Sequence, residues 1–285
     1  MSSATAAATT TAPPSRPVRA ITPAWAVSDA LAMTKRNLLR YVRLPTLLVF
    51  STIQPVMFVL LFTYVFGRAL RLPVSGLRYV DFLMPGIFVQ TVVFGATQTG
   101  VGLAEDLQGG MIERFRSLPM ARSAVLAGRT MGDTVRNLFV LLLMTAVGVA
   151  VGFRFHGGFF PAVGALFIAL GFGFAFSWIS ALIGLAAGNV EAAQAGSFVW
   201  IFPLVFASSA FVAVQSLPGW LQGWAKINPV TITVNALRAL TLGGNTQHAL
   251  QGGTIETHVL QAVAWIGGIL VVFIPLAVRR YRRTT

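Results

Sequence analysis

Long runs of apolar residues alternate with shorter polar and basic segments along the chain. A helix needs about 20 mainly apolar residues to cross a bilayer, and six runs meet or approach this length. The expected spans cover residues 44–66, 82–104, 130–153, 159–187, 192–214 and 259–278. The pattern therefore predicts an all-α, polytopic membrane protein with six transmembrane helices in one domain over residues 44–283.

Two of these runs contain a proline, and the third run begins in polar sequence. Pro55 and Pro203 predict kinks, which neighbouring helices can repair inside a bundle. The third run is strongly apolar only from Leu138, but its helical pattern extends backward through Met131. Asp133 and Arg136 then lie three residues apart at the start of this span, where they could pair.

The residues before the first run form two segments. Residues 1–22 are nearly all Ala, Thr, Ser and Pro, and we expect a disordered cytoplasmic tail. Residues 23–43 predict a separate amphipathic helix, with Thr22 as N-cap and Pro23 in the first position. At about 100° per residue, its apolar face and its basic face are opposed, which favours a helix lying along the membrane interface. The apolar face carries Val27, Leu31, Leu38 and Val42, and the basic face carries Arg36, Arg40 and Arg43 beside Asp29. The alternative is a helix packed on a soluble domain, but the chain has no second soluble domain.

Composition supports the membrane assignment. Of the 285 residues, 55% are apolar and only 10% are charged, and the mean hydropathy is +0.75. So few charges cannot cover a water-soluble globule, for which about 25% is usual. The net charge of +13 comes from basic residues that bracket the apolar runs and form no continuous stripe, so we expect no nucleic-acid partner. The chain has no cysteine, which excludes disulfides and thiolate sites.

The placement of Lys and Arg predicts the orientation. With six spans, fifteen of the 21 basic residues fall on the side that carries both termini, and six fall on the other. Arg129 and Arg136 count toward the first group, and Arg238 counts toward the second. Because cytoplasmic loops carry the excess of basic residues, both termini are expected in the cytoplasm.

The sequence offers little catalytic chemistry. The acidic residues fall mainly at span ends, and His156, His248 and His258 lack metal-ligand spacing. No phosphate-binding loop is present, so any ATP that powers this protein must bind to another chain. The central stretches of the spans show no ionisable residue, which argues against an ion-coupled carrier. Their neutral polar residues either line a substrate path or hydrogen-bond between helices; the path candidates are Gln54, Gln90, Gln98, Ser208 and Ser209.

The segment between the second and third spans contains exposed apolar side chains among charges. Apolar side chains on a short charged helix are costly unless they dock on a partner, although they could also rest on the membrane. The segment comprises Met111, Ile112, Glu113, Arg114, Phe115, Arg116, Leu118 and Pro119.

Two motifs resemble a known family. Glu113-Arg-Phe-Arg-Ser-Leu-Pro-Met-Ala-Arg122, followed by Gly128-Arg129, resembles a loop pattern of ATP-binding-cassette permeases of the type-2 exporter family. A second stretch runs from Leu217-Pro-Gly-Trp through Asn228-Pro229 to Ala236-Leu-Arg238 and Gly243, and is similar to that family's segment before the last span. With the amphipathic helix and the spans, the similarity covers about residues 23–283, and the chain is similar to membrane subunits of daunorubicin-resistance-type exporters.

This resemblance implies partners as well as a function. Such permeases pair with a second permease, identical or homologous, and bind two separate ATPase subunits that hold ATP and Mg. The segment Met111–Pro119 would be the coupling helix, and residues 23–43 would form a second ATPase contact. Residues 217–244 would form short helices that dip back at the outer face, including Pro218, Asn228, Pro229 and Arg238.

The chain is therefore expected to be a non-enzymatic transport subunit that binds no cofactor itself. It would lie in a bacterial inner membrane and export a hydrophobic or amphipathic drug or lipid. A polysaccharide or glycolipid exporter and an ion-coupled carrier are the alternatives. A membrane-embedded enzyme would need a clustered acidic or histidine site, which the sequence lacks.

Overall fold

A computed structural model describes residues 23–43, 45–67, 77–111, 122–243 and 252–284, and within these ranges the regular structure is entirely helical. The elements are α1 (Pro23–Arg43), α2 (Pro45–Leu60), the π-helix η1 (Leu61–Phe66), α3 (Tyr79–Gln108), α5 (Arg122–Val151), α6 (Phe159–Ala187), α7 (Val190–Phe206), the short 3₁₀ helix η2 (Val214–Ser216), α8 (Gly219–Ile227), α9 (Pro229–Leu242) and α11 (Ile255–Thr284).

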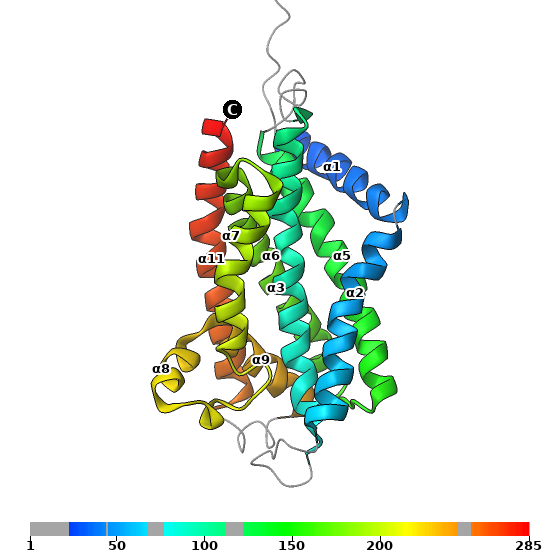
Figure 1. Cartoon of the computed structure of the whole chain (residues 1–285), viewed down its shortest axis with the longest axis vertical. Helices are drawn as coiled ribbons and strands as arrows, with labels where there is room; N and C mark the ends of the chain where they lie inside the picture. Colours follow the sequence, from blue (N-terminus) through cyan, green and yellow to red (C-terminus); the bar gives the residue numbers. More distant parts are fainter. Residues whose placement is uncertain (1–22, 44, 68–76, 112–121, 244–251, 285) are drawn as a thin grey trace, which may run out of the picture.

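The long helices form a bundle whose axis is the long axis of the molecule (Figure 1). Helix α3 is almost completely buried, whereas α11 exposes most of its apolar surface. Helices α8 and α9 cover one end of the bundle, and α1 lies against α5 at the opposite end, where α11 also terminates (Figure 1). The first described helix and the end of the last one therefore share one end of the molecule.

Four of the described helices are long and apolar enough to cross a membrane: α3, α5, α6 and α11. The apolar part of α2 with η1, Ser51–Val65, and the apolar helix α7 are shorter. They run beside the four long helices (Figure 1), but a 17-residue helix such as α7 rises only about 25 Å, less than the roughly 30 Å of a hydrocarbon core. The chain is a polytopic helical membrane protein, and the count of six spans remains a prediction.

Helices α3 and α6 cross at glycines, and this crossing holds the centre of the bundle together. A Cβ on Gly184 would overlap the carbonyl of Gly100, and a Cβ on Gly100 would overlap the carbonyl of Ser180. Nearer the N-terminal ends of the same two helices, a Cβ on Gly173 would come within 2.8 Å of Val92 Cβ. Small residues permit this close approach, which is the usual source of helix association in membranes.

Two helix boundaries differ from the prediction more than the others do. The third expected span begins eight residues earlier than predicted, because α5 starts at Arg122, and its first turns pack on α1 and α3. The fifth was expected to continue to Val214, but α7 ends at Phe206 and residues 207–213 bend away. Buried side chains from α9 supply the hydrogen bonds that let the chain leave the helix there, as described below.

Helix α1 spans the predicted residues and packs on α5 through a different face from the predicted apolar stripe. Met33 and Asn37 are buried, and Asn37 Nδ2 donates to the Gly128 carbonyl (3.3 Å). A Cβ on Gly128 would overlap Met33. Leu31, expected on the membrane-facing stripe, is 62% exposed, which leaves it free to face lipid. The side chains of Val27, Arg40 and Arg43 lie outside the description, as do the tail 1–22 and, except for Met111, the predicted coupling segment.

Candidate functional site

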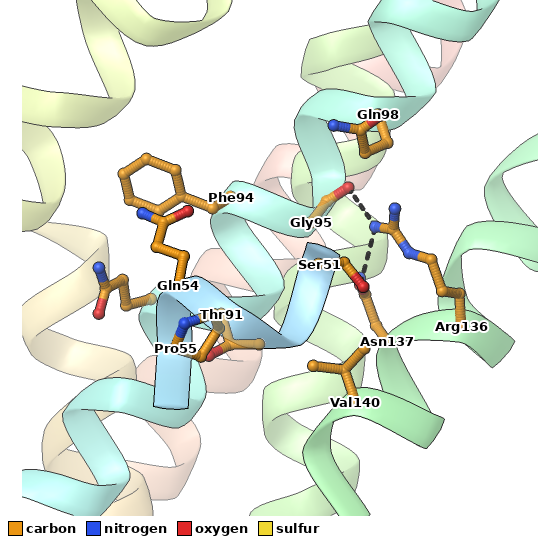
Figure 2. A pocket seen from close by; sticks show the side chains of 11 residues that line it. Ser51, Gln54, Pro55, Thr91, Phe94, Gly95, Gln98, Arg136, Asn137 and Val140 are labelled. Carbon is orange, nitrogen blue, oxygen red and sulfur yellow. Dashed lines mark hydrogen bonds between the residues drawn. The ribbon is translucent and has the colours of Figure 1, made fainter. Parts of the chain in front are cut away.

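A polar pocket opens between α2, α3 and α5, close to the middle of each helix (Figure 2). Its volume is about 90 Å³, and its lining is formed by Ser51, Gln54, Pro55, Gln90, Thr91, Phe94, Gly95, Gln98, Arg136, Asn137 and Val140. No carboxylate lines it, so a guanidinium, amides and hydroxyls set its chemistry. A polar cavity at this depth in a membrane bundle is a candidate binding site.

Three of the five predicted substrate-path residues meet in this pocket. Gln90 and Gln98 are eight residues apart on α3, which places them within about 80° of each other on the helix. Gln54 faces them from α2, next to Pro55. Gln90 is buried, whereas Gln54 and Gln98 remain exposed at the pocket mouth, where a ligand or another subunit could reach them.

Arg136 supplies the positive charge of the pocket and is held in place by α3. Its Nη2 donates to the carbonyl oxygen of Gly95 (2.6 Å) and to Asn137 Oδ1 (3.1 Å), as Figure 2 shows. A Cβ on Gly95 would overlap the Asn137 side chain. Glycine at position 95 therefore lets two polar side chains of α5 reach the backbone of α3.

A chain of buried charges extends from this pocket toward α1. Arg129 pairs with Asp106 on α3 (3.2 Å) and lies 3.9 Å from Asp133, and Asp133 accepts a hydrogen bond from Thr99. Asp106 is also 3.7 Å from Arg36 of α1. The network joins α1 to α3 and α5, two of the helices that line the pocket.

Arg36, expected on the basic face of α1, lies 3.7 Å from Asp106 of α3. The network also corrects one expectation from the sequence. The central stretches were expected to lack ionisable groups, yet Asp133 (1% exposed) and Arg136 (5%) are buried well inside the candidate span that begins at Val125. The signal was present in the spacing: Arg129, Asp133, Arg136, Asn137 and Val140 follow one face of a helix. It was missed because the loop was expected to continue to residue 130.

Ser208 and Ser209, the other two path candidates, lie in a separate cluster around Arg238. The Arg238 side chain is fully buried, donates to the carbonyls of Phe82 (3.0 Å) and Ser209 (2.7 Å), and stacks over the Phe82 ring at 3.5 Å. Arg238 also donates to Ser209 Oγ (3.2 Å). Arg238 thus hydrogen-bonds the carbonyl oxygen of Phe82 on α3 and that of Ser209 after α7, and these bonds hold α9 against α3. The cluster does not line the pocket. Its burial also means that Arg238 says little about membrane orientation.

Asn228 joins the helices at the same end. Its Oδ1 accepts from the Val230 amide (2.9 Å) and caps α9, while its Nδ2 donates to the carbonyls of Leu204 (2.8 Å) and Ala207 (3.2 Å). Pro229 occupies the first turn of α9, and Pro218 precedes α8. The Asn-Pro and Leu-Arg elements of the second motif thus explain the two short helices; their depth in the membrane is not determined by these contacts.

A larger pocket of about 380 Å³ lies between α5 and α6 beside the loop that joins them. Its lining is almost wholly apolar and includes Phe88, Leu142, Phe155, Phe159 and Leu166. Such a surface suits a hydrocarbon chain. In the part of the chain that the structure describes, no three His, Cys, Asp or Glu side chains come close enough to hold a metal ion.

Comparisons with known proteins agree with this architecture. Residues 29–242 match the family of ABC-2 type transporters. The chain is 35% identical over 267 residues to the daunorubicin resistance ABC transporter permease protein DrrB1 of Streptomyces coeruleorubidus, covering 94% of this chain and 89% of the relative. It is 26% identical over 262 residues to the probable doxorubicin resistance permease protein DrrC of Mycobacterium tuberculosis (91% and 90% covered), and 25% identical over 203 residues to the inner membrane transport permease YadH of Escherichia coli K12 (68% and 77%).

Proposed function

Because the chain belongs to the ABC-2 type transporter family, we propose that this permease subunit works in an ATP-driven exporter of hydrophobic or amphipathic compounds, drugs or lipids. The observation that carries the proposal is the polar pocket at mid-length of α2, α3 and α5, where three glutamines meet beside Arg136. A drug-sized ligand needs roughly 300–1,000 Å³, so a pocket of about 90 Å³ is one part of a larger path. A second permease copy, identical or homologous, would complete that path.

The energy for transport would come from two ATPase subunits that carry ATP and Mg. The sequence of this chain contains no phosphate-binding loop, and its relatives are named as permease proteins. We assign no catalytic residue and no cofactor to this chain. An ion-coupled carrier is less well supported, because the buried Asp133 is held by Thr99 of α3 and by Arg129 one turn earlier on α5, an arrangement suited to structural pairing.

The ATPase would dock at the end of the bundle that carries α1. Helix α3 ends and α5 begins there, on either side of the segment Met111–Pro119 in the sequence, and α1 lies beside both helices through its contacts with Gly128 and Asp106. A push on this segment would reach the pocket through Arg129 and Arg136. With the ATPase docked at that end, both termini would lie in the cytoplasm of a bacterial inner membrane, and the excess of basic residues near them supports this orientation.

The interface is tested by affinity capture of the ATPase on immobilised permease. Replacing Phe115 by Ala, or Arg114 by Glu, is expected to weaken capture about thirtyfold, since truncating an interface aromatic commonly costs about 2 kcal/mol. Phe160→Ala is the matched control: Phe160 is 85% exposed at the opposite end of the bundle, and its loss leaves capture unchanged. Equal capture by the Phe115 and Arg114 variants and the parent protein would remove this segment from the interface.

A further inference from the structure

Two buried polar groups in the pocket lack a partner in the described chain. Gln90 is 3% exposed and Thr91 is 6% exposed, and both line the pocket from α3. Gln90 Oε1 and Thr91 Oγ1 make no hydrogen bond to the described part of the protein. Unsatisfied buried polar atoms are rare in native proteins because they forfeit their hydration without compensation. Their presence together on one wall points to a ligand group that supplies the missing hydrogen bonds.

The remaining lining restricts the charge of that group. Arg136 is the one ionisable residue among the lining residues, so a cationic head group would face a guanidinium across a small, poorly hydrated space. A carboxylate would be attracted to Arg136, but it can only accept hydrogen bonds and would leave Gln90 Oε1 without a donor. A hydroxyl both donates and accepts, and therefore matches the Gln90 oxygen as well as the amide and guanidinium donors.

The size of the pocket sets a limit on the group as well. A volume of about 90 Å³ is well below the roughly 300–1,000 Å³ of a pocket that holds a drug-sized ligand. This space admits a small head group with two or three hydroxyls, and it excludes the whole of an amphipathic compound. Phe94, Pro55 and Val140 provide apolar surface in the same lining, against which the first carbons of an attached chain can pack.

We propose that this pocket binds the neutral, hydroxylated head group of the amphipathic substrate, with Gln90 and Thr91 as the residues that select it. The proposal rests on the export function proposed above and adds a substrate class to it. Gln90 Oε1 accepts a hydrogen bond from one hydroxyl, Thr91 Oγ1 bonds a second, and Arg136 donates to a hydroxyl oxygen. Matched compounds that carry an ammonium or a carboxylate in place of the hydroxyls bind more weakly.

The test measures binding to the purified permease in lipid nanodiscs, without ATPase or ATP. Three probes share an eight-carbon chain: 1-O-octylglycerol, octyltrimethylammonium and octanoate. Thermal-shift titration should show the tightest binding for octylglycerol. Gln90→Leu should weaken octylglycerol about tenfold, the usual effect of losing one hydrogen bond, and leave the two charged probes unchanged. Thr91→Val, which preserves shape, should weaken it by a smaller factor and serves if the Leu variant does not fold.

The stability of the ligand-free protein separates this role from helix packing. Gln90 Oε1 has no described partner to lose, so Gln90→Leu should leave the melting temperature unchanged or raise it. Gln261→Leu, on the exposed surface of α11, is the matched control and should alter neither binding nor stability. Loss of stability in Gln90→Leu without loss of octylglycerol affinity would overturn the inference, as would equal binding of the three probes or binding of none.

Failure of this inference can be told apart from failure of the proposed function. A complex that transports amphipathic compounds with ATP, but whose head-group preference is the same in the parent and in Gln90→Leu, contradicts only the role of the pocket. A permease that binds octylglycerol through Gln90 but supports no ATP-dependent transport contradicts the export function and leaves the binding site standing.

Discussion

Asp133 is the buried carboxylate that balances the positive charge of Arg129 on α5. Its carboxylate, 1% exposed, accepts from Thr99 on α3 and lies 3.9 Å from Arg129 one turn earlier on α5. Arg129 itself fits against α3 because position 102 is glycine, where a Cβ would overlap its guanidinium. Removing one member of such a buried set leaves the opposite charge without full compensation, which is costly away from water.

We therefore predict that Asp133→Asn lowers the stability of the permease. Losing the charge beside buried arginines should cost about 3 kcal/mol and lower the melting temperature by about 5–10 °C. The measurement is thermal unfolding of the purified protein in detergent. Glu256→Gln, which removes a charge from the exposed first turn of α11, should leave the melting temperature unchanged. Equal melting temperatures for both variants would show that the Asp133 charge contributes nothing to the fold.

At the level of helices, α3 and α6 pack backbone against backbone where they cross at Gly100 and Gly184. The carbonyl of Gly100 occupies the space in which a side chain at Gly184 would begin. Because that neighbour is backbone, it cannot move aside as a side chain could, and the two helices must separate to admit a methyl group. Overpacking of this kind typically costs 1–3 kcal/mol, roughly.

Gly184→Ala should accordingly lower the melting temperature by about 5 °C. Gly267→Ala is the matched control on α11: nothing lies within 4 Å of the added Cβ, and alanine has a higher helix propensity than glycine, so its stability should be unchanged or higher. Thermal unfolding of the two variants side by side is the measurement. A Gly184 variant as stable as the Gly267 variant would mean that α3 and α6 are not packed as closely as described.

Apolar run length predicted most of the helices, because crossing a bilayer requires it. The expected run 159–187 coincides with α6. The helix 23–43, which was expected from its amphipathic pattern and not from run length, coincides with α1. Run length failed where buried polar residues take part in the fold. The start of α5 is polar because its charges pair with α1 and α3, and α7 ends early because Asn228 and Arg238 accommodate the backbone that follows.

The site could be predicted only in part, for a related reason. Spacing within one helix placed Gln90 and Gln98 on one face, since helix geometry is local. Which helices meet across the pocket depends on tertiary packing, which a single sequence does not reveal. Gln54 lies in the same pocket as Gln90 and Gln98, whereas Ser208 and Ser209 lie elsewhere. Arg136, expected only at the start of the third span, also lines the pocket.

For the whole molecule, the arrangement of ends leads to a prediction of topology. Helix α1 and the end of α11 lie at one end of the bundle, and α8 lies at the other (Figure 1). The chain has no cysteine, so a cysteine introduced at one position is the only thiol in the chain that a maleimide can label. In intact cells, a membrane-impermeant maleimide should label Gly223→Cys, which lies on α8 with open space around it, and should label Thr284→Cys only after lysis. The reverse labelling pattern would invert the orientation proposed here.

The central claim is that this subunit forms the path through which an ATPase drives amphipathic compounds outward. Inside-out membrane vesicles test it most directly, because an exporter then accumulates compound in the lumen. Vesicles that contain the permease and its ATPase should take up a fluorescent amphipathic compound when ATP is added. Uptake should be lost when either subunit is omitted or when ATP is replaced by a non-hydrolysable analogue. It should persist when an ionophore collapses the proton gradient. Uptake that survives without ATP hydrolysis, but disappears with the proton gradient, would contradict the account.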